Sequence, residues 1–163
     1  MGAVLFDLEG TLVDTTVIAR HREARAWREC IARVDRTDMY EGVRELLVEL
    51  DARQVPWGVV TNIPSNLAVA ILRHHAIRPA STICFHDVPR GQHKPHPAMC
   101  LKALGQLGSN AAGSIGVGDT SADALAFQSA GLHGYCAAWN QDADRASAWR
   151  GILDAPGDVL ALL

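Results

Sequence analysis

Short apolar segments alternate with longer amphipathic stretches along almost the whole chain, and this alternation restricts the fold more than any other feature. The apolar segments are too short for helices and end at polar residues or glycine, which is typical of buried strands. They are residues 3–6, 57–60, 81–85, 114–117 and 134–138. The stretches with helical character are residues 15–34, 42–53, 65–72, 97–107, 121–130 and 157–163. This order predicts a parallel sheet with helices on both faces.

The length of the chain indicates how many domains to expect. A chain of 163 residues is long enough for one domain with a substantial core and too short for two ordinary ones. The sequence contains no internal repeat, low-complexity tract or interdomain linker. We therefore expect a single α/β domain over residues 1–163, three-layered and Rossmann-like, with a mostly parallel central sheet.

Composition excludes several classes of protein. The formal net charge of −3 provides no basic surface, so we expect no nucleic-acid partner. No apolar run approaches the roughly 20 residues that span a bilayer, and no charged leader precedes the first strand, so we expect no membrane association. The four cysteines are scattered and form no CxxC pair, which argues against a zinc site and a disulfide framework. Reduced core thiols in a cytoplasmic protein are the simplest interpretation.

Polar side chains follow the first four predicted strands. In an open α/β sheet, ligands bind beyond the carboxyl ends of the strands, where the strand order reverses. The residues at these ends are Asp7 and Glu9, Thr61 and Asn62, Lys94, and Asp119 and Asp123. Carboxylates, hydrogen-bond donors and a lysine are the groups that phosphoryl transfer requires.

Four segments around these residues resemble, in order, the signature motifs of the haloacid dehalogenase superfamily. They are residues 7–14, 60–62, 94–97 and 116–123. Residues 41–47 and 126–131 are also similar to its phosphoglycolate phosphatase and β-phosphoglucomutase branch, and the resemblance extends over about residues 3–139. It implies a phosphatase that hydrolyses a phosphate monoester with Mg²⁺.

Three carboxylates at one sheet edge would repel one another unless a cation shares the site, and hard oxygen ligands suit Mg²⁺. The resemblance implies that Asp7 is both the nucleophile and a metal ligand. It further implies that the backbone carbonyl of Glu9 and the carboxylate of Asp119 bind the metal. Asp123 would support the metal directly or through water. Attack by Asp7 would form an aspartyl-phosphate, which water then hydrolyses.

The remaining site residues are expected to bind phosphate and to move protons. Thr61 and Asn62 can donate hydrogen bonds to phosphate oxygens, Lys94 adds a positive charge, and Gly10 allows a tight turn with exposed N–H groups. Most phosphatases of the superfamily carry Asp at the position of Glu9, as the acid that protonates the leaving oxygen. The enolase-phosphatase branch is similar here in having Asp-x-Glu-Gly-Thr. We therefore expect Glu9 to be the acid–base group.

The segment between the first two motifs also differs from the phosphoglycolate phosphatase and β-phosphoglucomutase branch, because it is much shorter. Members of that branch place a helical cap domain between the first two motifs, whereas this chain has only a vestigial cap at about residues 15–39. We therefore expect an open site, for a small phosphorylated metabolite or a bulkier phosphoester, or a site closed by a partner subunit in a homo-oligomer. The arginines of this segment (Arg20, Arg22, Arg25 and Arg28) form either a solvated face or an attractive surface for an anionic substrate.

Two other functions are compatible with the same motifs. A phosphotransferase or mutase would keep the Asp7 chemistry, although a reduced cap would exclude water poorly. A catalytically weak relative would bind a phosphorylated ligand or a partner protein. Glu9 and the short cap favour this last alternative. The joint presence of all four motif residues argues against it, namely Asp7, Thr61, Lys94 and Asp119.

Overall fold

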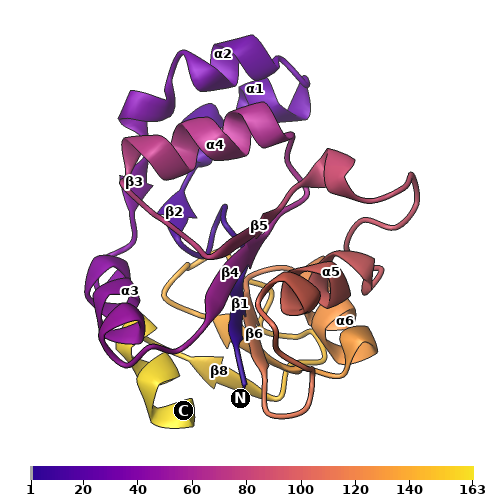
Figure 1. Cartoon of the computed structure of the whole chain (residues 1–163). Coiled ribbons are helices and arrows are strands. Elements are labelled where there is room, and N and C mark those ends of the chain that lie inside the picture. Colours follow the sequence, from indigo (N-terminus) through magenta and orange to yellow (C-terminus); the bar gives the residue numbers. More distant parts are fainter. Residues whose placement is uncertain (1) are drawn as a thin grey trace.

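The computed structural model, which describes residues 2–163, has a parallel six-stranded sheet at its centre (Figure 1). Across the sheet the strand order is β5-β4-β1-β6-β7-β8, and every neighbouring pair is parallel. The strands are β1 (Val4–Phe6), β4 (Trp57–Val60), β5 (Ser81–Ile83), β6 (Ile115–Gly118), β7 (His133–Ala137) and β8 (Gly151–Leu153). The predicted parallel sheet is confirmed, and the edge strand β8 is an addition to it.

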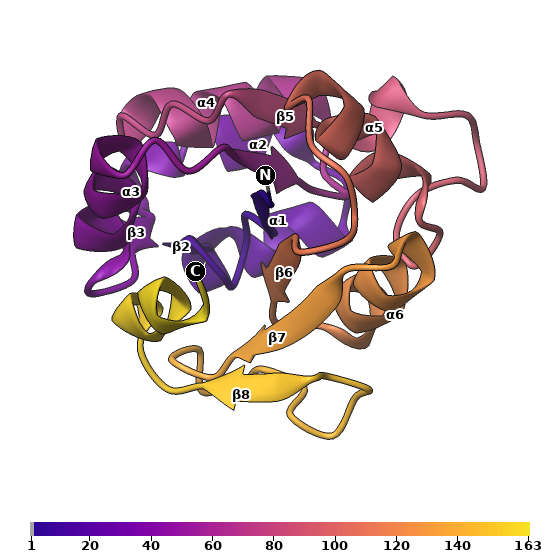
Figure 2. The same cartoon turned by 60° about the horizontal axis from the view of Figure 1, so that its bottom comes forward.

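Helices cover both faces of the sheet (Figure 2). One face packs against α3 (Val43–Ala52) and α4 (Ser65–His74), and the other against α5 (Ala98–Gln106) and α6 (Ser121–Ala130). The alternation of side chains along β1 divides the core in the same way. Phe6 belongs to the cluster that includes α3 and α4, whereas Leu5 belongs to the cluster of α5 and α6. The predicted three-layer α/β domain is therefore observed.

The strand order reverses beside β1. From β1 the chain moves outward to β4 and β5, then returns to the other side of β1 and continues through β6, β7 and β8. Ligands of doubly wound sheets bind at this reversal, outside the carboxyl ends of the strands. The ends of β1 and β6 are adjacent there, because Phe6 pairs with Val117.

A short antiparallel pair, β2 (Val13–Asp14) and β3 (Asp38–Met39), connects this domain to a helical insertion. The insertion contains η1 (Thr16–Ile18), α1 (Ala19–Glu23), α2 (Trp27–Ile31) and η2 (Val34–Arg36). The stretch predicted as helical is thus interrupted. Arg25 has a positive φ of 53°, which ends α1 and turns the chain so that α2 packs against α4.

Several element boundaries differ from the sequence prediction. The third strand ends at Ile83, and the next residues form η3 (Phe85–Asp87). The helix α4 begins at Ser65 and continues past residue 72 to His74, and the C-terminal segment is a 3₁₀ helix, η4 (Pro156–Leu162). All four cysteines are buried and unpaired, as expected. Among the residues described, no helix combines the length and the apolar character required to cross a membrane.

Candidate active site

All eight residues predicted for the site line one pocket of about 460 Å³ at the carboxyl ends of the central strands. They belong to the loops that follow β1, β4 and β6, to the first turn of α6 and to the loop before α5. They are Asp7, Glu9, Gly10, Thr61, Asn62, Lys94, Asp119 and Asp123. The roles assigned to them from the sequence stay predictions, but the structure brings the whole set together.

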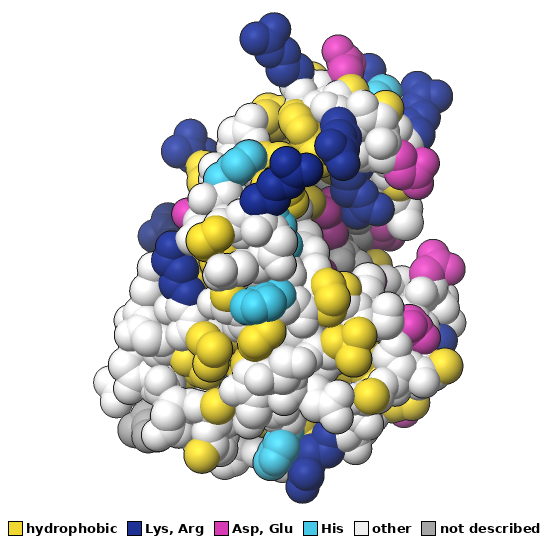
Figure 3. All heavy atoms as spheres, turned by 90° about the vertical axis from the view of Figure 1, so that its right-hand side faces the viewer, with side chains coloured by type: hydrophobic (Ala, Val, Ile, Leu, Met, Phe, Trp, Pro, Cys, Tyr) yellow, Lys and Arg dark blue, Asp and Glu magenta, His cyan; other side chains and the backbone are white. Residues whose placement is uncertain are grey.

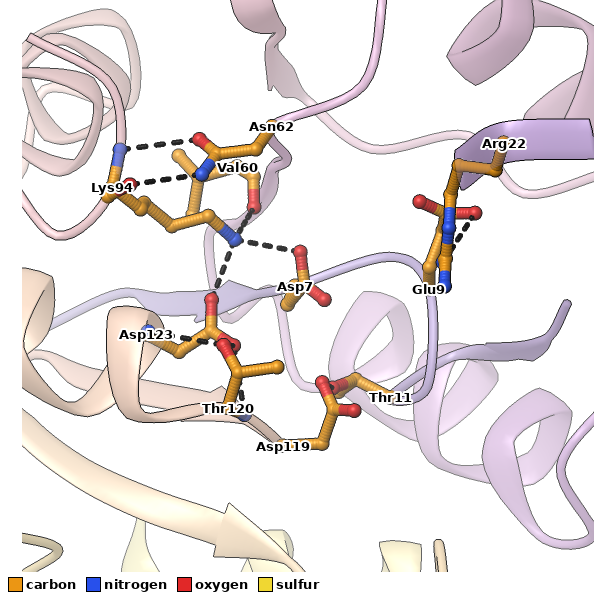
Figure 4. A network of polar contacts seen from close by, with 10 residues as sticks. All are labelled: Asp7, Glu9, Thr11, Arg22, Val60, Asn62, Lys94, Asp119, Thr120 and Asp123. Atoms are coloured by element: carbon orange, nitrogen blue, oxygen red, sulfur yellow. Dashed lines mark hydrogen bonds and ion pairs between the residues drawn. The ribbon is translucent and has the colours of Figure 1, made fainter. Parts of the chain in front are cut away.

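Lys94 occupies the centre of the polar network (Figure 4). Its Nζ donates to Oδ1 of Asp7 at 2.6 Å, to Oδ1 of Asp123 at 2.5 Å and to the Val60 carbonyl at 2.8 Å. An ammonium has three protons, so these bonds use its full capacity. Because all three side chains are buried, Lys94 is held rigidly beside Asp7.

Asn62 fixes the backbone of Lys94 from both sides. Its Oδ1 accepts from the Lys94 N–H at 3.1 Å, and its Nδ2 donates to the Lys94 carbonyl at 2.9 Å. The peptide bond that follows, between Lys94 and Pro95, is cis. The side chain of Asn62 is therefore directed at Lys94, and its predicted contact with phosphate stays a prediction.

Asp123 lies in the first turn of α6 and has both carboxylate oxygens engaged. Oδ1 accepts from Lys94, while Oδ2 accepts from the N–H of Thr120 at 3.1 Å and from its hydroxyl at 2.6 Å. With the return bond from the Asp123 N–H to Thr120, this is a capping box. Helix capping and the support of Lys94 are thus both functions of Asp123, and its predicted role at a metal is not tested.

Asp119 is linked to the first loop through a residue that the sequence analysis did not identify. Nδ2 of Asn140 donates to Oδ2 of Asp119 at 3.1 Å and to the Gly10 carbonyl at 3.0 Å. Thr11 donates to Oδ1 of Asp119 at 3.3 Å. Asn140 comes soon after β7, so the strand-end rule used for the other residues could have found it.

The pocket holds more negative than positive charge. Asp7, Asp119 and Asp123 each offer an oxygen within 4.8 Å of the others, and Lys94 is the one cation in contact with them among the residues described. Burial raises the pKa of Asp7 well above its ordinary value, and Asp123 and Asp119 add to the shift, whereas Lys94 opposes it. Burial and Asp123 raise the pKa of Asp119 to about 6. An all-oxygen site with excess negative charge fits a divalent cation such as Mg²⁺.

The same carboxylates act on Lys94. Burial alone would lower the pKa of its ammonium, but Asp123 and Asp7 outweigh that effect and raise the pKa above its ordinary value. Lys94 therefore stays charged, as its predicted role requires.

Both the backbone conformation at position 10 and the atoms around it require glycine. Its φ is +78°, and a Cβ at this position would lie 2.2 Å from Oδ2 of Asp119. The loop after β1 can therefore approach Asp119 only with glycine here.

Glu9 is contacted from the helical insertion. Nη1 of Arg22, in α1, lies 3.1 Å from Oε1 of Glu9, whose side chain is buried (Figure 4). Thr16, Ala19 and Trp27 of the insertion also line the pocket. The short insertion thus forms one wall of the pocket. The sequence identified Arg22 only as a member of a basic cluster.

The fold and the site together define a doubly wound α/β protein with an acidic pocket, built around one lysine, at the reversal of its strand order. The chain belongs to the haloacid dehalogenase-like hydrolase family, which matches it over residues 19–137. The resemblance drawn from the four motifs is thereby confirmed. The matched range begins after the loop that contains Asp7, Glu9 and Gly10.

Comparisons with individual proteins agree with this family. The phosphoglycolate phosphatase of Xanthomonas campestris is 32% identical over 101 residues, which are 62% of this chain and 46% of that protein. The N-acetylmuramic acid 6-phosphate phosphatase of Pseudomonas aeruginosa is 34% identical over 94 residues, 56% of this chain and 41% of that protein. This chain therefore spans about half the length of the relatives it matches. A HAD phosphatase from Thermococcus onnurineus has the same fold, with a TM-score of 0.82 at 16% identity over 99% of this chain and 97% of that one.

Proposed function

We propose that the protein is a phosphatase that hydrolyses a phosphate monoester through an aspartyl-phosphate on Asp7. One observation carries the proposal. Asp7 lies at the reversal of the strand order, its Oδ1 is held by Lys94, and its Oδ2 accepts no hydrogen bond from the described residues. A fixed carboxylate with one uncommitted oxygen is suited to attack phosphorus.

The proposed reaction has two steps. Oδ2 of Asp7 attacks phosphorus, the bond from phosphorus to the leaving oxygen breaks, and Glu9 gives that oxygen a proton. Glu9 then takes a proton from water as the water oxygen attacks phosphorus. The bond from phosphorus to Asp7 breaks, which releases inorganic phosphate and regenerates the carboxylate.

The other side chains position the phosphate and balance its charge. Lys94, whose three protons are already engaged, would act on the phosphate through its positive charge, Thr61 would donate to a phosphate oxygen, and Asn62 would act by fixing the backbone of Lys94. Asp7, Asp119 and the backbone carbonyl of Glu9 would hold Mg²⁺, with Asp123 behind them. When bound, Mg²⁺ supplies positive charge for the phosphate oxygens of the transition state.

The relatives favour a small phosphorylated metabolite as substrate, since two of them are named for phosphoglycolate and N-acetylmuramic acid 6-phosphate. The unpaired, buried cysteines are consistent with the cytoplasmic location that we propose. Residues 15–39 are proposed to be a reduced cap within a single domain, and a homo-oligomer stays an expectation.

Phosphate release tests the proposal. Wild type is assayed on p-nitrophenyl phosphate, phosphoglycolate and N-acetylmuramic acid 6-phosphate, with Mg²⁺ and with EDTA, beside Asp7→Asn and the exposed control Asp154→Asn. We expect metal-dependent turnover that Asp7→Asn lowers by about 10³-fold or more and Asp154→Asn leaves unchanged. Turnover that survives Asp7→Asn would overturn the mechanism. Isomerised sugar phosphates would favour phosphotransfer, and binding without turnover would favour the catalytically weak relative.

A further inference from the structure

Two further hollows continue the catalytic pocket along the surface. The first, of about 310 Å³, shares Trp27 and Asn62 with the catalytic pocket. The second, of about 420 Å³, shares Arg25, Phe85 and His86 with the first. These two hollows form one groove, the side trough, which leads away from the catalytic pocket between the helical insertion and the loop after β5.

The charge of the side trough is opposite to that of the catalytic pocket. Arg25 and Arg90 line it, and none of the described residues that line it is acidic. Neither arginine side chain makes an ion pair or a hydrogen bond within the part of the chain that the structure describes. Figure 3 shows basic side chains gathered beside a hollow that contains acidic ones. A ligand that extends from the catalytic pocket into the trough is therefore favoured if its far part is anionic.

The trough also presents an aromatic surface. Phe85 is 38% exposed, and the ring of His93 stacks on it with centroids 3.8 Å apart and planes within 2°. Nε2 of His93 donates to the Phe85 carbonyl at 2.8 Å, which fixes the pair. His86 meets the Phe85 ring edge-on at 5.1 Å. Large exposed rings held in this way favour contact with another flat ring.

We propose that the side trough binds the leaving group of the substrate, and that this group carries a flat ring and a second anionic group. The proposal rests on the phosphatase function and adds the chemical class of the ester. The scissile phosphate would lie at Asp7, and the part of the substrate next to it would pass Trp27 and Asn62. The ring would then contact Phe85, and the second anion would contact Arg25, which lines both hollows, with Arg90 adding positive charge in the second one.

Three phosphate esters separate these contributions, because each adds one feature to the one before. Ribose 5-phosphate has neither feature, adenosine 5′-monophosphate adds the ring, and adenosine 3′,5′-bisphosphate adds the second anion. We expect kcat/KM of the wild type to rise by about fivefold or more at each step. An equal kcat/KM for all three esters would overturn the proposal.

Single-residue variants show which residue produces each rise in kcat/KM. Phe85→Ala is expected to lower kcat/KM about fivefold for both adenosine esters and to leave ribose 5-phosphate unchanged. Arg25→Gln is expected to lower kcat/KM about tenfold for the bisphosphate alone. Arg28→Gln removes the same charge from an exposed arginine that lines none of these hollows, and it should change nothing. Equal losses on all three esters would contradict a role in the leaving group.

Calorimetric titration with adenosine 3′,5′-bisphosphate measures binding in the trough independently of hydrolysis, so it tests the trough proposal apart from the phosphatase function. If no ester is hydrolysed but Arg25→Gln weakens binding about tenfold, the phosphatase function is wrong and the trough stands as a ligand site. If Asp7-dependent hydrolysis occurs without preference for the ring or the second anion, the function stands and the trough proposal is wrong. If adenosine 3′,5′-bisphosphate does not bind and the enzyme shows no preference among the three esters, the trough proposal is wrong.

Discussion

The guanidinium of Arg22 lies 3.1 Å from the carboxylate of Glu9, so a five-residue helix of the insertion reaches the proposed acid–base group. The Glu9 side chain is 8% exposed and that of Arg22 is 35% exposed. Glu9 is one methylene longer than the aspartate most common at this position in the superfamily. The longer side chain lets the carboxylate move away from the position in which it would transfer a proton. The contact with Arg22 restricts this movement.

Replacing Arg22 should therefore lower turnover more than it weakens substrate binding. We expect Arg22→Gln to reduce kcat about tenfold, because small errors in the position of a catalytic group are costly. Arg22→Lys should recover part of the loss, since it keeps a charge near Glu9. Steady-state kinetics measure the effect, with Arg28→Gln as a control on the neighbouring helix. An unchanged kcat in Arg22→Gln would show that Glu9 needs no support from the insertion.

Lys94 should be as important for stability as for turnover. It neutralises Asp7 and Asp123 inside the domain, and removing one partner of a buried ion pair leaves an uncompensated charge. We expect Lys94→Met to lower the free energy of unfolding by about 3 kcal/mol in EDTA, as measured with urea. The double variant Lys94→Met/Asp123→Asn should recover part of the loss. Lys102→Met, at an exposed lysine, is the control. If Lys94→Met and Lys102→Met had the same free energy of unfolding, the argument would be refuted.

Much of the site could be predicted because local sequence patterns place its residues. Short apolar segments identify the strands, and side chains just after parallel strands meet at one edge of the sheet. This is why Asp7, Thr61 and Asp119 lie together although they are far apart in the sequence. The strand β8 was not predicted, because it has only three residues, lies at the sheet edge and buries only Leu153.

The partners of individual side chains could not be predicted, because tertiary contacts decide them. Asn140 bonds Gly10 across 130 positions of the sequence. Asn62 turns to the Lys94 backbone, and the capping box of α6 takes one oxygen of Asp123. The predicted phosphate and metal contacts of Asn62 and Asp123 did not account for these competing hydrogen bonds.

Gly10 and Gly91 form a matched pair for testing the approach to Asp119. Both have a positive φ, of 78° and 85°, but a Cβ at Gly91 would meet nothing within 4 Å. Substitution by alanine should therefore cost each position about 1 kcal/mol of backbone strain, and Gly10→Ala should add the clash with Asp119. We expect only Gly10→Ala to lower both Mg²⁺-dependent thermal stabilisation and turnover. Equal effects of the two variants would exclude the steric explanation.

His75 connects the end of α4 to the insertion and should make stability depend on pH. The Thr37 hydroxyl donates to the Val34 carbonyl at 2.6 Å, so it accepts from Nε2 of His75 at 2.8 Å. Burial lowers the pKa of His75, and the nearby His74 and Arg44 lower it further, against the opposing effect of Asp38. The unfolded chain, with a histidine pKa of about 6.5, therefore binds a proton more readily than the folded one.

The contribution of neutral His75 to stability is consequently complete above about pH 6.5 and is lost as the pH falls through the lower folded-state pKa. We expect the free energy of unfolding, measured with urea from pH 7.5 to 5, to fall more steeply with decreasing pH in wild type than in His75→Gln. His74→Gln, at the exposed neighbouring histidine, removes one of the effects that lower the pKa of His75, so its slope should lie between those of wild type and His75→Gln. Parallel curves for wild type and His75→Gln would mean that this histidine titrates alike in the folded and unfolded chains.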